Sequence, residues 1–271
     1  MVVQHNLRAM NSNRMLGLTA STQAKSTEKL SSGYKINRAA DDAAGLSISE
    51  KMRRQIRGLT QSSLNAQDGI SMVQTAEGAL NEVHDMLQRM NELAVKAANG
   101  TLQSEDRGYI QVEVDQLLDE IDRTTNDTKF NKMSLLNTND AVTLQVGTEA
   151  GQVISFNREN MNCSELGIDG IDMEDATGAG ASAAISLIES AIQTVSTFRA
   201  NLGAVQNRLE HTVNNLDNVV ENTTAAESQI RDTDMATEMV KYSNNQILAQ
   251  AGQAMLAQSN QANQGVLSLL Q

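Results

Sequence analysis

The sequence predicts a mainly α-helical protein, an elongated antiparallel helical bundle or coiled coil with one small β-hairpin. Small and apolar residues recur every three and four positions over long stretches, which is the 3.5-residue repeat of helices that pack along their length. Proline is absent, so nothing interrupts such helices. Aromatic residues make up only 2% of the chain, which indicates thin seams of smaller side chains instead of a compact core built on large rings.

The second half of the chain contains the longest repeat, from Ala184 to Ile230. At 1.5 Å per residue, a helix over this stretch measures on the order of 70 Å and needs a partner of similar length. The repeat consists of Ala184, Ile188, Ala191, Val195, Phe198, Leu202, Val205, Leu209, Thr212, Leu216, Val219, Thr223, Ala226 and Ile230.

The first half supplies that partner. The same spacing runs through Val73, Ala76, Leu80, Val83, Leu87, Met90, Ala94 and Ala97, and Ile48, Met52, Leu59 and Ala66 extend it towards the N-terminus. A shorter helix is predicted next, because Ile110, Val114, Leu117, Ile121 and Thr124 share one face. We expect Ser104 to cap this helix, with Glu105 and Asp106 complementing the helix dipole in its first turn.

Between the two halves the period changes. Val142, Leu144 and Val146 alternate with polar residues, a glycine-containing turn follows, and apolar residues return at 153–156. This pattern predicts a β-hairpin near residues 142–156. Residues 157–180 are rich in glycine and acidic residues and are predicted to form a connecting loop.

Both ends of the chain are polar, with a sparse apolar stripe. Each is too poor in apolar surface to stay folded alone, so we expect the two ends to pair as a two-helix coil and to become ordered only within an assembly. The candidate self-assembly seam consists of Leu7, Met10, Ile247, Leu248, Met255, Val266 and Leu269.

The charge is distributed unevenly. Residues 1–60 carry ten Lys and Arg against four Asp and Glu, whereas the chain as a whole has a net charge of −12. Two features argue against nucleic-acid binding. The basic N-terminal segment has only one aromatic residue, Tyr34, that could stack on a base, and the acidic remainder of the chain repels phosphate. No apolar run is long enough to span a membrane, and no secretory signal peptide is apparent, so these features alone predict a cytoplasmic protein. Cys163 is the only cysteine, which excludes an internal disulfide.

Several segments closely resemble bacterial flagellin, the subunit of the flagellar filament. They include LSSGYKINRAADDAAGLSISEKMRRQIRGL (30–59), LQRMNELAVKAANGT (87–101), TKFNKMSLLN (128–137), LQVGTEAGQVISF (144–156), QIRDTDMATEMV (229–240) and QILAQAGQAMLAQSNQ (246–261). The resemblance covers nearly the whole chain and corresponds to a short form without the variable outer domains. Two features differ from many relatives: a proline is missing from the stretch 261–266, and the chain ends in Gln271 where Arg is common.

The resemblance implies a structural subunit that polymerises into the filament for motility. Residues 1–42 and 235–271 would form an inner terminal-helix domain that is disordered in the free monomer, and residues 43–234 a rod-like helical bundle domain. The protein would be exported unfolded through the flagellar channel by the type III apparatus, without a cleaved signal peptide, and would be extracellular. Implied partners are other copies of the chain, an export chaperone, and junction and cap proteins. The alternatives are a minor or weakly polymerising flagellin that acts mainly as a receptor ligand, and a hook–filament junction protein.

The resemblance also points to a receptor surface. Arg89, Leu93 and Glu113 match the flagellin surface that the flagellin-sensing Toll-like receptor of animal hosts recognises, and Gln88 and Glu92 lie beside them. Arg89 and Leu93 are four residues apart and project from one surface of a helix. The alternative for Leu93 is packing against the next helix.

No residues support catalysis, and we predict neither an enzyme nor a cofactor. Asp41 and Asp42 lack a nearby His or Cys and fit a charged turn between helices better than a metal site. The three histidines, His5, His84 and His211, lie far apart, and no HExxH motif occurs.

Overall fold

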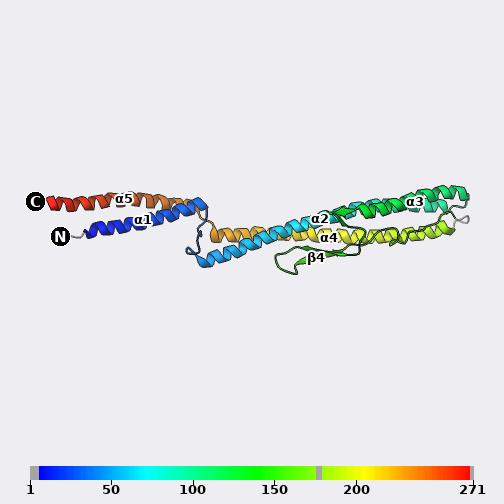
Figure 1. Cartoon of the computed structure of the whole chain (residues 1–271), viewed down its shortest axis with the longest axis horizontal. Helices are drawn as coiled ribbons and strands as arrows, with labels where there is room; N and C mark the ends of the chain where they lie inside the picture. The colour runs from blue at the N-terminus through cyan, green and yellow to red at the C-terminus, as the bar shows by residue number, and fades with distance from the viewer. Residues whose placement is uncertain (1–5, 175–178, 269–271) are drawn as a thin grey trace. The chain divides into compact units, whose positions relative to one another are not determined.

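A computed structural model describes residues 6–174 and 179–268 of the chain, with side chains up to Ala262. It is mainly helical, as predicted, with α1 (Leu7–Ser32), α2 (Ala43–Ala97), α3 (Ser104–Asp127), α4 (Ala179–Arg231) and α5 (Met235–Ser268) (Figure 1). Two antiparallel strand pairs lie between α3 and α4 in the sequence: β1 (Lys129–Phe130) with β2 (Met133–Ser134), and β3 (Ala141–Gln145) with β4 (Val153–Asn157). The described residues form two compact units, one from 6–56 and 221–268 and one from 57–220, and α2 and α4 contribute to both.

The unit of residues 57–220 has its core where the two long repeats meet. All eight repeat residues from Val73 to Ala97 are buried, and so is every repeat residue of α4 from Ala184 to Leu209. The two helices run antiparallel, since Ser63 bonds to Asp217 at 3.1 Å while Glu77 and Arg199 form an ion pair at 3.8 Å. The predicted pairing of the two halves of the chain is therefore confirmed within this unit.

Helix α3 packs on α2 through the predicted face, with Ile110, Val114 and Ile121 buried. The expected cap at Ser104 is wrong by one residue. Gln103 is the extended N-cap residue, and its N–H donates to the Asp106 carboxylate at 3.2 Å, so Ser104 is already helical. At the same end of this helix pair the buried Arg107 guanidinium donates to the carbonyl oxygen of Ala97 at 2.9 Å, which closes the last turn of α2.

The predicted hairpin is present as β3 and β4, and it packs closely against α2. The amide of Asn65 donates to the carbonyl oxygen of Gln145 at 3.1 Å, while Ile154 and Phe156 of β4 are buried in the core. Close approach depends on glycine: a Cβ added at Gly69 would overlap with Leu144 Cδ1 and lie 3.3 Å from Leu209 Cδ1. The absence of a side chain at Gly69 thus makes room for the hairpin.

Replacing this glycine gives a first prediction. Gly78 lies on the same helix with nothing within 4 Å of an added Cβ, so Gly78→Ala is expected to stabilise the protein by up to about 1 kcal/mol. Gly69→Ala gains the same helix propensity but displaces Leu144, and we expect it to be less stable than Gly78→Ala by about 1 kcal/mol or more. Urea unfolding of both variants checks this difference. Equal effects at the two positions would contradict the close packing of the hairpin.

The segment from Arg158 to Glu174 contains neither helix nor strand, as predicted, but it is more than a connector. It buries six side chains in the core: Met161, Cys163, Leu166, Ile168, Ile171 and Met173. The backbone N–H of Cys163 donates to Asp122 at 2.8 Å and its thiol to the carbonyl oxygen of Leu118 at 3.3 Å. Burial raises the pKa of the Cys163 thiol, so this cysteine is poorly reactive in the folded protein.

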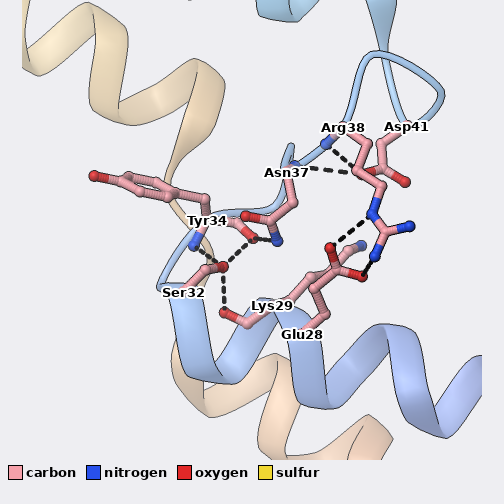
Figure 2. A network of polar contacts seen from close by, with 7 residues as sticks. All are labelled: Glu28, Lys29, Ser32, Tyr34, Asn37, Arg38 and Asp41. Carbon is pink, nitrogen blue, oxygen red and sulfur yellow. Dashed lines mark hydrogen bonds and ion pairs between the residues drawn. The ribbon is translucent and has the colours of Figure 1, made fainter.

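In the unit of residues 6–56 and 221–268, helix α1 ends at Gly33 in a left-handed conformation with φ of 79°. Figure 2 shows the contacts that follow: the Arg38 guanidinium donates to both carboxylate oxygens of Glu28 at 3.0 and 3.2 Å, and Asp41 accepts from the backbone N–H of Arg38 at 3.0 Å. This backbone bond holds the pKa of Asp41 below its usual value. Asp42 accepts from the N–H of Gly45 and caps α2. The predicted charged turn is confirmed.

Candidate functional site

Helices α1 and α5 lie side by side and run antiparallel (Figure 1). Near one end of the pair the Asn6 amide donates to the carbonyl oxygen of Ser259 at 3.2 Å, and near the other the Ser26 hydroxyl donates to Glu238 at 2.6 Å. The side chains between these contacts follow a heptad spacing, and we call them the inner seam. They are Ala9, Ser12, Leu16, Thr19, Gln23 and Ser26 of α1, with Glu238, Tyr242, Asn245, Ala249, Gly252, Leu256 and Ser259 of α5.

The inner seam differs from the predicted one. The residues that close the pair within one chain are mostly small or polar, and none of them belongs to the candidate self-assembly seam. Small residues face larger ones across the pair: a Cβ on Gly252 would lie 3.4 Å from Leu16 Cδ1, in ordinary van der Waals contact. Polar residues bond to one another at the two ends of the pair, so larger apolar side chains are not needed there.

The large apolar side chains point away from the inner seam instead. The exposed fractions of Leu7, Met10, Ile247, Leu248 and Met255 are between 58% and 67%. In the heptad of α5, Ile247 lies opposite the seam and Leu248 on its flank, positions that are usually polar in a solvated coil. The remaining exposed large apolar residues of this outer apolar surface are Met15, Leu18, Met239 and Val240. Of the predicted seam, the Val266 side chain and Leu269 lie outside the described residues.

The second candidate surface lies on α2 and α3. Arg89 bridges the two helices, since its guanidinium contacts Glu113 of α3 at 2.9 Å and Glu92 of α2 at 3.0 Å. The hydrogen bond to Glu113 is the main cause of the raised pKa of Arg89. The exposed fractions of the Arg89, Glu92 and Glu113 side chains are 51%, 69% and 46%. Gln88 is also exposed on α2, and its amide nitrogen lies 2.8 Å from a ring nitrogen of His84.

Leu93 does not belong to this exposed surface. Only 3% of it is accessible, and it packs in the core between the helices. The expectation that Arg89 and Leu93 project from one exposed surface is therefore wrong, and the alternative of helix packing is correct. The reason is that α3 covers this side of α2, as the Arg89–Glu113 contact shows.

Sequence reasoning missed two exposed apolar residues next to this cluster. Tyr109 is 76% and Val112 62% exposed on α3, and Val112 immediately precedes Glu113. A signal was present in the sequence, because both residues fall outside the apolar spacing of Ile110, Val114, Leu117 and Ile121 that defines the packed face of α3.

The described part of the chain contains neither a metal-binding cluster nor a membrane-spanning helix. Within residues 6–174 and 179–268, no group of three or more His, Cys, Asp or Glu side chains is placed to hold a metal ion. No described helix is both long enough and apolar enough to cross a membrane.

Comparison with known proteins gives a consistent result. The bacterial flagellin N-terminal helical region matches residues 3–141, and the bacterial flagellin C-terminal helical region matches residues 185–270. The chain is 52% identical to the flagellin of Halalkalibacterium halodurans and 48% identical to that of Bacillus subtilis, with 100% of each chain covered. It is 49% identical to the flagellar filament 31.3 kDa core protein of Treponema maltophilum, again over the whole of both chains.

Solved structures agree. The crystal structure of Bacillus cereus flagellin matches 56% of this chain and 88% of that one, with 31% identity and a TM-score of 0.51. A putative flagellar hook-associated protein from Vibrio parahaemolyticus matches 71% of this chain and all of its own at a TM-score of 0.62, but at 16% identity this likeness concerns the fold alone. With two family regions in the expected order and full-length relatives near 50% identity, the chain belongs to the bacterial flagellin family, whose members are structural proteins and not enzymes.

Proposed function

We propose that this protein is the structural subunit of an extracellular bacterial flagellar filament and that it polymerises with copies of itself. The observation that carries the proposal is the outer apolar surface of α1 and α5, where Ile247 and Leu248 are 61% and 58% exposed on a helix that is already paired. Large apolar side chains on the solvent side of a coil indicate a surface that another protein covers. Neighbouring subunits supply that cover.

The proposed inner domain consists of residues 1–42 and 235–271, and residues 43–234 form the domain outside it. Two helix boundaries support this division, since α2 begins at Ala43 and α5 at Met235. In the free monomer the inner domain is disordered most of the time and the α1–α5 pair forms only transiently, because its seam buries few large apolar side chains, and contact with neighbours orders it.

Delivery follows the route that the family resemblance implies. The chain leaves the cell unfolded through the flagellar channel, by the type III apparatus and with an export chaperone, and meets junction and cap proteins at the filament end. A single cysteine supports this route, because no intrachain disulfide has to be reduced before passage.

Seeded growth tests the proposal. Purified monomer is added to short filament seeds and the product is observed by electron microscopy, beside a chain that lacks residues 1–42 and 235–271. Long filaments from the full chain alone are expected. A full chain that stays monomeric with fresh seeds would contradict the filament proposal and favour the alternative of a minor, weakly polymerising flagellin.

A hook–filament junction protein is the weaker alternative. It would share the terminal helices and form only a short ring. Identity over the full length to the flagellins of two bacterial genera and to a flagellar filament core protein of a third favours the filament subunit. Growth that stops at rings in the seeded experiment would favour the junction protein instead.

We also propose that the monomer binds the flagellin-sensing Toll-like receptor of animal hosts through Gln88, Arg89, Glu92 and Glu113. The exposed ion cluster that joins α2 to α3 supports this second function, because an accessible arginine next to exposed apolar side chains is typical of contact centres. Leu93 is buried in the core and offers no exposed contact to a receptor.

Single substitutions in the cluster test receptor binding. Arg89→Ala and Glu113→Ala are each expected to weaken binding of the monomer about tenfold or more, since hot-spot residues at interfaces contribute that much. Their effect on stability should be small, because exposed ion pairs contribute little. Surface plasmon resonance measures binding, and thermal melting checks the fold. Arg123→Ala, which removes a similar exposed pair with Glu120, is the control. Unchanged affinity in both cluster variants would exclude this surface.

A further inference from the structure

The inner seam has little to fix how α1 lies along α5. Successive heptads of α1 present similar side chains: Ser12, Thr19 and Ser26 occupy equivalent positions. Apolar contacts are also sparse, because Leu16 and Leu256 are the only leucines among the described residues of the inner seam. Sliding one helix by a heptad would therefore change the buried apolar surface little.

The register is held at the junction of the two helices by backbone hydrogen bonds, from the N–H of Thr233 to the carbonyl oxygen of Gly33 at 2.9 Å and from the N–H of Lys35 to that of Arg231 at 2.8 Å. Within the helix pair itself, one contact between two buried side chains is also specific to the observed register. Glu238 is 6% exposed and Ser26 3% exposed, and the Ser26 hydroxyl donates to the Glu238 carboxylate at 2.6 Å. The other carboxylate oxygen lies 3.4 Å from Nζ of Lys241. The Ser26 hydroxyl, followed by the nearby Lys241 and Lys29, holds the pKa of Glu238 below its usual value, so the group is a buried carboxylate with a matched donor.

We propose that Glu238 is a positioning residue that selects the register of α1 against α5, and thereby sets which outward apolar side chains of the two helices share one assembly surface. The link to assembly rests on the proposed filament function, whereas the register itself does not. A buried polar residue that specifies register in a thin coil is a well-established device in helix pairs.

Slipped registers explain why Glu238 is selective. If α1 moves by one heptad in one direction, Thr19 takes the place of Ser26 and Thr22 that of Lys29, so the carboxylate loses a nearby positive charge. If it moves in the other direction, Gly33 comes opposite Glu238, beyond the end of α1, and offers no hydroxyl. Either slip leaves a buried carboxylate with weaker compensation, which disfavours it.

Cysteine pairs can report the register directly. An added Cβ at Gly252 lies 4.0 Å from Cβ of Leu16, a separation that suits a disulfide. The pair Leu16→Cys with Gly252→Cys therefore reports the observed register. By heptad spacing, Ala9→Cys or Gln23→Cys with Gly252→Cys reports the two slipped registers. Each full-length double-cysteine chain is oxidised both as monomer and within seeded filaments. The fraction of protein with the intrachain disulfide is measured from its shifted mobility on a non-reducing gel. The natural chain, whose only thiol is the buried Cys163, is the negative control.

In the natural background, only the 16/252 pair should cross-link efficiently. Glu238→Leu keeps an apolar group in the seam but removes the register signal, so the 16/252 yield should fall at least about threefold while the slipped pairs rise. Glu238→Gln retains an oxygen that accepts from a hydroxyl but carries no charge. The 23/252 pair, whose register offers no hydroxyl, should therefore stay low, whereas the 9/252 pair, whose register offers the Thr19 hydroxyl, should rise. Gln246→Leu places the same leucine on an exposed position of α5 and is the matched control.

Two cross-linking outcomes would overturn the inference: an unchanged 16/252 yield in Glu238→Leu, or loss of all three cross-links, which would show a role in stability alone. Seeded growth then tests the link to assembly. Glu238→Leu should elongate at least about tenfold more slowly than Gln246→Leu, and equal rates would contradict the link. Failure of the natural chain to form filaments would overturn the filament proposal alone, because the register is read in the monomer as well.

Discussion

Ile247→Glu is expected to abolish filament growth. Ile247 is 61% exposed on the side of α5 opposite the inner seam, so the substitution leaves the α1–α5 pair intact. Under the proposed filament function a neighbouring subunit covers this position, and a carboxylate without a partner would be buried there. Burying such a charge costs several kcal/mol, which corresponds to a rise of at least about 100-fold in the monomer concentration that supports growth. Sedimentation of seeded reactions over a range of monomer concentrations measures this value.

Two controls make the result specific. Ile247→Leu keeps the apolar character and should polymerise like the natural chain. The substitutions Leu16→Cys and Gly252→Cys, introduced together into the Ile247→Glu chain, should form their disulfide normally and show that α1 and α5 still pair. Growth of Ile247→Glu at the natural concentration would contradict the assignment of the outer apolar surface to subunit contacts.

Leu80→Ala is expected to destabilise the unit of residues 57–220 strongly. Leu80 is completely buried where the repeats of α2 and α4 meet, so truncation removes packed methyl groups and leaves a cavity. Such substitutions typically cost about 2–5 kcal/mol. Leu64 lies on the same helix but is 48% exposed, and Leu64→Ala should cost well under half as much. Urea unfolding of the two variants compares them, and similar losses would argue against the α2–α4 core.

The parts of the fold that sequence predicts best are those where periodicity and packing agree. The repeats are buried without exception from Val73 to Ala97 and from Ala184 to Leu209, because a 3.5-residue apolar spacing places these side chains in one seam against another helix. The β3–β4 hairpin is also found where alternation around Leu144 places it. The flagellin family follows from the motifs themselves.

The elements that escaped prediction lack a period or depend on one residue. The buried loop through Met161 and Met173 has no regular spacing, so its contribution to the core appears only in three dimensions. The small β1–β2 pair turns at Asn131 and Lys132, both with positive φ, and lysine is an unusual residue for such a turn. The position of the α3 cap depends on the backbone of Gln103.

The terminal helices show a different limit of sequence reasoning. Two stripes run along α5, one apolar through Ile247 and Leu248 and one small and polar through Ala249 and Gly252. Hydrophobicity alone selects the apolar stripe as the intrachain seam. The structure uses the other, where small residues face larger ones and Glu238 finds its donor. The apolar stripe is therefore exposed in the single chain and is available for contacts with other subunits.

Protection of the outer apolar surface on assembly tests the central claim most directly. Leu248→Cys, at a position 58% exposed in the single chain, is treated with a thiol reagent as monomer and as filament, with buried Cys163 as the unreactive internal reference. The account predicts rapid labelling of the monomer and labelling at least about tenfold slower in the filament. Equal labelling rates in both states would show that the surface stays open to solvent and would contradict the account.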